Sequence, residues 1–235
     1  MDERKLQLMT KLVDAYISTA HPVGSQVLVQ RYRLSWSTAT IRSDLSLLEQ
    51  EGYMFQPHTS AGRVPTHRGY QLYLKNTKAA RLHHSLERSL ARMGSGLSTF
   101  EDLQELCRIL SQLSEEVVFA VTPLSTITSG MRFISKKPEA DDRTFLRDIT
   151  AAIDALDTLC ERLVPSDAED VACIIGDEES FGAACSALVV RMPFQRTHVL
   201  IGMLGPLRMN YGKNIALLSA IISQAEQCPA SPNNP

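Results

Sequence analysis

The sequence predicts an α+β protein of two domains, and three observations lead to this prediction. In the N-terminal part, apolar residues recur at spacings of three and four, which is typical of amphipathic helices. In the C-terminal part, short apolar runs typical of strands lie between helical patterns, at 117–121, 171–175, 185–192 and 197–204. The third observation is that the two parts carry opposite net charge.

The charge changes sign near residue 92. Residues 1–92 contain 13 Lys+Arg and 7 Asp+Glu, a balance of +6, whereas residues 93–235 contain 11 and 19, a balance of −8. A basic domain is therefore joined to an acidic one in a chain whose formal net charge is only −2. The basic part is suited to a polyanionic partner such as a nucleic acid.

The composition indicates a soluble globular chain. Its 235 residues are 44% hydrophobic and 21% charged, which is enough for a sizeable core. The longest nearly apolar run, 215–222, is too short to span a bilayer, and the first residues lack a secretory apolar segment. We therefore expect a cytoplasmic protein. The five cysteines form no CxxC pair and have no histidine at a metal-ligand spacing, so we expect buried thiols and neither a metal nor a cofactor.

The sequence gives no support to an enzyme. Asp177, Glu178 and Glu179 are adjacent carboxylates, but neighbours in a loop point in different directions, and no basic partner is near them in sequence. His198 lies in an apolar run, where a lone histidine is more often structural than catalytic. No nucleotide-binding, nucleophile-elbow or zinc-protease motif occurs. We expect no catalytic residue.

The basic part begins with three predicted helices. The first covers about 4–19 and ends before the His21-Pro22 turn, and Ser25 is placed to cap a short second helix. Ser37 is placed to cap the third helix, and Gly52 lies where a glycine commonly ends one.

The third predicted helix has two contrasting faces. Ile41, Leu45 and Leu48 fall on one side, which we expect to be buried. The opposite side has no carboxylate and carries small, hydroxyl and amide side chains around one arginine: Ala39, Arg42, Ser43, Ser46 and Gln50. Small side chains let a helix enter a groove, and Arg and Gln suit the base edges of the DNA major groove. A polar helix face for solvation alone is the more common alternative.

A hairpin is predicted directly after this helix. Residues 53–56 have strand composition, 57–62 are rich in turn formers, and 63–64 can form a short return strand. Three helices followed by a hairpin are the pattern of a winged helix-turn-helix, in which one helix enters the major groove and the wing contacts phosphates. The alternative is a winged helix that contacts protein or RNA, which would leave the basic charge without a use.

This part resembles the HrcA family of bacterial heat-inducible transcription repressors over about residues 5–75. The resemblance is carried by Pro22–Ser25, Ser37–Leu45, Leu48–Tyr53 and Gln56–Thr66. Two positions depart from the family pattern: Thr38 stands where Pro is usual, and Ser43 where Asn is usual.

The resemblance implies a homodimer that binds an inverted-repeat operator of double-stranded DNA upstream of chaperone genes and is released on heat stress. It also implies the GroE chaperonin as a modulator that favours the active form. By the same analogy, Ala39, Thr40, Arg42 and Ser43 approach base edges, and Ser25, Thr38, Thr59, Ser60, Gly62 and Arg63 hold phosphates. Ser37 and Ser46, on the same helix, complete the expected DNA-binding set. Gly62 has a second interpretation, as a residue that lets the hairpin turn with positive φ.

Beyond the hairpin, Thr66 is placed to cap a helix that runs through Leu74 and Leu82 to Met93, and Gly94-Ser95-Gly96 breaks the pattern. We therefore expect a DNA-binding domain with its linker helix at 1–93, a regulatory and dimerisation domain at 97–226 and a loose tail at 227–235. Further helices are predicted at 103–113, 144–163 and 211–224.

The second domain resembles the HrcA family more weakly, in Ile175–Glu179 and Ile201–Tyr211, which match that family's GAF-like domain. Family members carry an inserted dimerisation domain in the interval that residues 124–170 occupy here. The resemblance thus implies a small GAF-like α+β domain with a shortened interval. The alternative is a winged-helix regulatory interaction protein that has lost chaperonin-responsive repression.

Overall fold

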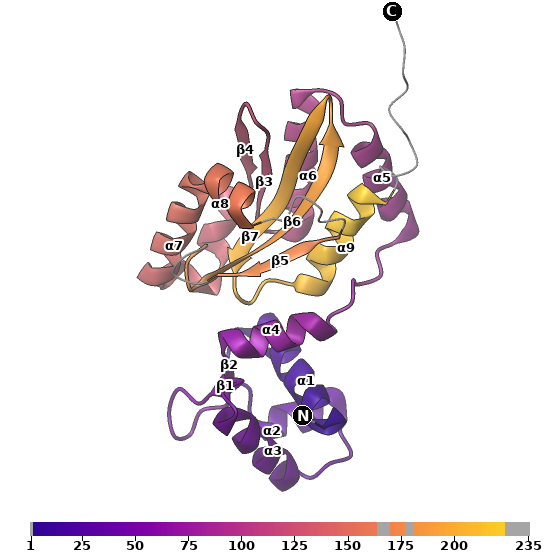
Figure 1. The fold of residues 1–235 in the computed structure, drawn as a ribbon. Helices are drawn as coiled ribbons and strands as arrows, with labels where there is room; N and C mark the ends of the chain where they lie inside the picture. Colours follow the sequence, from indigo (N-terminus) through magenta and orange to yellow (C-terminus); the bar gives the residue numbers. More distant parts are fainter. Residues whose placement is uncertain (1, 164–169, 177–180, 224–235) are drawn as a thin grey trace, which may run out of the picture. The chain divides into compact units, whose positions relative to one another are not determined.

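The computed structural model describes residues 2–163, 170–176 and 181–223, and the chain divides into two compact units, Met1–Thr77 and Lys78–Pro235. Helices and sheet are both present, as the α+β prediction requires (Figure 1). The division falls earlier than the expected boundary at residues 93–97. The segment 78–93, which we assigned to the first domain, belongs to the second unit because its helix packs there.

The first unit consists of helices followed by a short hairpin and one more helix. Its elements are α1 (Glu3–Thr19), α2 (Ser25–Tyr32), α3 (Thr38–Gln50), β1 (Met54–Phe55), β2 (Val64–Pro65) and α4 (His67–Asn76). The strands are antiparallel, with Phe55 opposite Val64. Leu8, Leu12, Ile41 and Leu45 are fully buried, and α1 contacts α3, so the two helices share one core.

Most of the expected helix caps are confirmed. Ser37 Oγ accepts the Thr40 amide at 3.1 Å, and Thr66 Oγ1 accepts the Gly69 amide at 3.2 Å. Gly52, which follows the C-cap Glu51 of α3, has φ +76°, the left-handed conformation that favours glycine. The prediction for Ser25 is wrong: it is the first residue of α2, and Gly24 is the cap, without a side-chain hydrogen bond.

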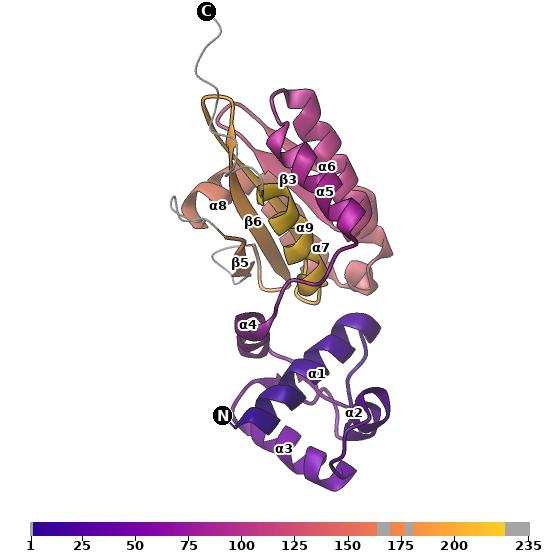
Figure 2. The ribbon, with the colours of Figure 1, turned by 90° about the vertical axis from the view of Figure 1, so that its right-hand side faces the viewer.

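The second unit is an antiparallel sheet with helices on both faces (Figure 2). Its helices are α5 (His84–Ser95), α6 (Phe100–Ser114), η1 (Met131–Lys136), η2 (Pro138–Asp141), α7 (Arg143–Asp154), α8 (Leu156–Leu163) and α9 (Tyr211–Ile222). Its strands are β3 (Val117–Val121), β4 (Thr126–Ser129), β5 (Ala172–Ile175), β6 (Cys185–Phe194) and β7 (Thr197–Pro206), in the order β4-β3-β7-β6-β5.

Alternate residues of the central strands face opposite sides of this sheet. Phe119 of β3 packs with Phe145 and Ile149 of α7 in one buried core. On the other face, α6 contacts β3 and α9 contacts β6, while α5 packs against α9. None of the helices in the described ranges has the length and apolar composition of a membrane span.

The expected helix from Thr66 to Met93 is two helices. Residues 77–83 form an extended connection in which the Ala80 amide donates to Gly212 O at 2.8 Å. The second of them ends at Ser95 with Gly96 as its cap, within the expected break at 94–96. Gly94 is still helical: a Cβ there would lie 2.0 Å from Ile221 O, so its lack of a side chain allows α5 to approach α9 closely.

Other corrections are smaller. The expected helix 144–163 divides at Ala155, the cap of α7, and α8 then directs Leu156 into the core. Strand β4 was not predicted. Cys107 and Cys185 are buried as expected, whereas Cys173 on the edge strand β5 is exposed. Asp177–Glu179 and the tail 227–235 lie outside the described residues.

Candidate nucleic-acid interface

A groove of about 510 Å³ opens in the first unit where the start of α2, the outer face of α3 and the hairpin meet. Three consecutive residues at the start of α2, three from α3 and a stretch of the hairpin form its walls. They are Gly24, Ser25, Gln26, Arg42, Leu45, Ser46, Gln56, Thr59, Ser60, Ala61, Gly62 and Arg63.

The groove brings together residues that the sequence predicts to contact DNA. Seven of the expected set line it, from three separate segments: Ser25, Arg42, Ser46, Thr59, Ser60, Gly62 and Arg63. The remaining five are exposed at the start of α3, outside the groove lining: Ser37, Thr38, Ala39, Thr40 and Ser43. The groove thus brings seven of the twelve expected residues together, and the other five are exposed on α3 or at its cap.

The two faces of α3 differ as expected. Ile41, Leu45 and Leu48 are fully buried, whereas Arg42 and Ser43 are exposed. The side chain of Arg42 forms no ion pair among the residues that the structure describes. Its guanidinium donors are thus available to an external acceptor.

Both carboxylates of α3 are paired with arginine side chains. Asp44 is 4% exposed and accepts two hydrogen bonds from Arg4, at 2.8 and 3.1 Å. Glu49 pairs with Arg63 of the hairpin at 3.0 Å. Because each carboxylate is balanced by an arginine, the groove-facing side of the helix has little negative charge to repel phosphates.

Gly62 has a different role from the expected positive-φ turn, because its φ is not positive. A Cβ at this position would lie 2.4–2.6 Å from backbone atoms of Pro22 and Val23. The neighbouring Arg63 exchanges two backbone hydrogen bonds of 2.9 Å with Val23. Glycine is required here because the hairpin backbone lies directly against the turn before α2.

The guanidinium of Arg63, which we expect to contact a DNA phosphate, is already bound within the unit. Its Nε and Nη2 donate to Glu49 Oε2 at 3.2 and 3.0 Å, and its side chain is 14% exposed. Nη2 also lies 3.5 Å from Ser46 Oγ. Arg63 therefore ties the hairpin to α3 at the edge of the groove.

Sequence reasoning missed Glu49 and Gln56. The Gln56 amide donates to Glu49 Oε1 at 3.0 Å, and Gln56 Nε2 donates to the carbonyls of Thr59 and Ala61 at 3.0 and 2.7 Å. Both residues thus organise the hairpin that carries Thr59 and Ser60. The only sequence signal was their place in the family-like segments, since a long-range pairing has no local pattern.

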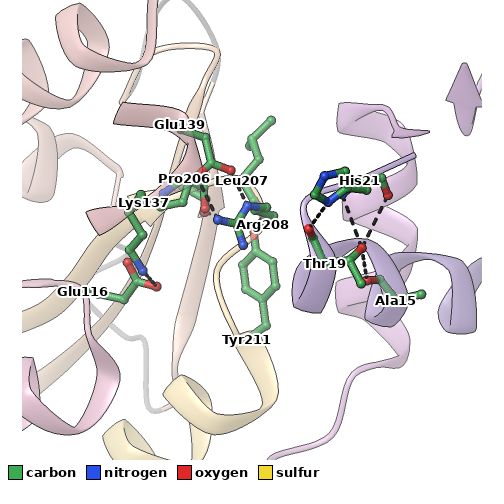
Figure 3. Close-up of polar contacts among 11 residues, drawn as sticks. Ala15, Thr19, His21, Glu116, Lys137, Glu139, Pro206, Leu207, Arg208 and Tyr211 are labelled. Carbon is green, nitrogen blue, oxygen red and sulfur yellow. Dashed lines mark hydrogen bonds and ion pairs between the residues drawn. The ribbon is translucent and has the colours of Figure 1, made fainter. Parts of the chain in front are cut away.

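The second unit holds a separate cluster of charged groups (Figure 3). Lys137 Nζ lies 2.8 Å from Glu116 Oε1, and Arg208 pairs with Glu139, with Nη2 and Oε2 3.0 Å apart. Burial raises the pKa of Glu116 to about 7, against the opposing effect of Lys137. In the described part of the chain, no three His, Cys, Asp or Glu side chains are grouped to hold a metal ion.

The chain is thus a two-unit α+β protein, with a groove in its helical unit and helices on both faces of the antiparallel sheet in the other unit. The crystal structure of a hypothetical protein at 2.2 Å resolution shares this fold, with a TM-score of 0.78, 17% identity, and coverage of 97% of this chain and 98% of that one. A family model described as the HrcA protein C terminal domain matches residues 73–215. The chain belongs to the HrcA family.

Two relatives show how far the similarity extends. The heat-inducible transcription repressor HrcA of Acidothermus cellulolyticus is 40% identical over 125 residues, 52% of this chain and 37% of that protein. The repressor of the same name from Frankia casuarinae is 33% identical over 171 residues, 72% of this chain and 50% of that protein. The chain thus spans half or less of the length of these curated relatives. Both relatives carry the name of a transcription repressor.

Proposed function

We propose that the first unit is a winged helix-turn-helix that binds operator DNA, with α3 as the reading helix and the β1–β2 hairpin as the wing. The observation that carries this proposal is the groove, which brings Arg42 and Ser46 of α3 together with Thr59 and Ser60 of the hairpin. A reading helix flanked by phosphate-binding donors is the arrangement that such domains use on duplex DNA.

The exposed side chains divide into two roles. Arg42, with Ala39, Thr40 and Ser43 beside it, approaches base edges, and arginine is the residue best suited to guanine in the major groove. Hydroxyl and backbone donors around the helix hold phosphates: Ser25, Ser37, Thr38, Ser46, Thr59, Ser60 and Gly62. Hydroxyl groups at helix N-termini and in tight turns are frequent phosphate partners.

The second unit is proposed as a GAF-like regulatory and dimerisation domain. The name of its relatives, heat-inducible transcription repressor, supports repression that is released on heat stress. The proposal extends this to a cytoplasmic homodimer that binds an inverted repeat upstream of chaperone genes. The GroE chaperonin is the proposed modulator. A dimer places two α3 helices on successive major-groove faces of one inverted repeat.

The proposal is tested by titrating the full chain against three duplexes of equal length: the inverted repeat, a single half-site, and a scrambled sequence. We expect the inverted repeat to bind about a thousandfold more tightly than the scrambled duplex at physiological salt. Affinity for every duplex should fall as salt rises, because phosphate contacts release counterions. Equal binding to all three would contradict operator reading and favour a winged helix that contacts another partner.

A second titration tests whether chaperonin modulates DNA binding. Adding purified chaperonin to the titration is expected to raise operator affinity. A repressor that binds the repeat but does not respond to chaperonin has lost that regulation, which would restrict the proposal to DNA binding.

A further inference from the structure

Glu49 connects the two sides of the candidate DNA surface. It lies near the end of α3, with its side chain 31% exposed, and each of its oxygens accepts from the hairpin. Oε1 accepts the backbone amide of Gln56, the residue after β1. Oε2 accepts Nε and Nη2 of Arg63, the residue before β2.

One carboxylate therefore holds both ends of the hairpin loop. Gln56, at the first end, closes the loop by donating its side-chain amide to Thr59 O and Ala61 O. Arg63, at the second end, is fixed on its other side by backbone hydrogen bonds to Val23. The loop that carries Thr59 and Ser60 is thereby tied to α3 by Glu49 and to the turn before α2 by Arg63.

We infer that Glu49 is a positioning residue for DNA recognition: it contacts no DNA itself and sets the position of the hairpin loop relative to Arg42 on α3. This inference rests on the proposed function. It also changes the role of Arg63, whose Nε and Nη2 are engaged by Glu49, from a simple phosphate clamp to the link through which Glu49 acts.

Positioning and plain electrostatics predict opposite effects for the same substitution. Glu49→Gln removes a negative charge beside the groove, and electrostatics alone would make every duplex bind more tightly. Loss of the ion pair instead frees the hairpin, so the positioning role predicts weaker binding to the operator. The sign of the change separates the two explanations.

The experiment compares the full wild-type chain with Glu49→Gln and with a matched control, Glu51→Gln. Glu51 is two residues further along and undergoes the same charge change, but its side chain lies 3.7 Å from Lys5 and does not line the groove. We expect Glu49→Gln to reduce the preference for the inverted repeat over the scrambled duplex about tenfold. This size is typical of the coupling between residues in direct contact. Glu51→Gln is expected to keep that preference.

A second readout follows the hairpin without DNA. Amide hydrogen exchange of Gln56, Ala61 and Arg63 reports on the bonds that fix the loop, and we expect faster exchange in Glu49→Gln but not in Glu51→Gln. Melting temperature checks that each variant is folded, and Glu49→Asp, with a shorter side chain, is expected to restore only part of the protection.

The outcomes separate the inference from the proposed function. If Glu49→Gln matches Glu51→Gln in exchange or in operator preference, the positioning role is overturned. If the wild-type chain itself does not prefer the operator, the proposed function fails, and exchange alone then decides whether Glu49 fixes the hairpin.

Discussion

Lys137 Nζ lies 2.8 Å from Glu116 Oε1, and the carboxylate that it meets is 3% exposed. The second oxygen, Oε2, has no hydrogen-bond partner among the described residues. Gly205 makes room for this carboxylate, because a Cβ there would lie 2.4 Å from Oε2. The pair joins the residue after η1 to the residue before β3, and it places a carboxylate in a buried position.

This buried charge predicts a pH dependence of stability. The pKa of Glu116 rises on folding from the ordinary glutamate value of 4.5 to about 7, because burial disfavours the charged form. Between these values the folded state binds more protons than the unfolded state, so stability is highest at the acidic end and falls as pH rises toward 7. The full loss is on the order of 3 kcal/mol for a shift of this size.

Glu116→Gln is expected to remove this decline and to be more stable than wild type at pH 8. The measurement is the free energy of unfolding from pH 5 to pH 8. Glu105→Gln is the control, because Glu105 is exposed and Arg108 lowers its pKa, so it does not titrate in this range. An identical decline in wild type and Glu116→Gln would show that Glu116 does not carry the effect.

Close contact between α5 and α9 makes Gly94 intolerant of a side chain. Gly94→Ala places a methyl group against Ile221 O and is expected to destabilise the second unit by about 1–3 kcal/mol. Gly212→Ala is the matched control on α9, since its Cβ meets only ordinary contacts from 3.4 Å outward, and a helical alanine is favoured over glycine. Chemical denaturation of both variants measures the difference, and equal stabilities would contradict the packing explanation.

Gly62→Ala is expected to push the hairpin away from Val23 and to weaken operator binding by about tenfold or more, as groove geometry changes. Gly24→Ala, in the same groove, is the control because no atom lies within 4 Å of its added Cβ. Operator titrations of the two variants provide the comparison. Binding by Gly62→Ala that equals the control would mean that the hairpin position is unimportant.

The first three helices, the hairpin and four of the five strands of the second unit could be predicted from the sequence because local periodicity and caps such as Ser37 indicate them. The division at residues 77–83 could not. Leu82, Leu86 and Leu90 continue a helical stripe, and the connection is extended because the Ala80 amide bonds to Gly212, far away in sequence. Periodicity carries no information on such a partner.

The candidate site was predictable to a similar degree. The outer face of α3 follows from helix geometry alone, so Arg42 and Ser43 were placed on the exposed side correctly. The pairing of Glu49 with Arg63 and the contact of Gly62 with Val23 depend on how the hairpin folds back on the helices. These contacts decide what each residue does, and they require the tertiary structure.

The most direct test of the central claim, that the outer face of α3 reads operator bases, is a base-pair scan of one half-site with wild type and Arg42→Ala. Lys75→Ala is the control, because it removes the same charge from an exposed site outside the groove. Arg42→Ala is expected to cost about 1–3 kcal/mol on the operator and to lose discrimination at one base pair while keeping it at the others. A uniform loss at every position, equal to that of Lys75→Ala, would contradict base reading by α3.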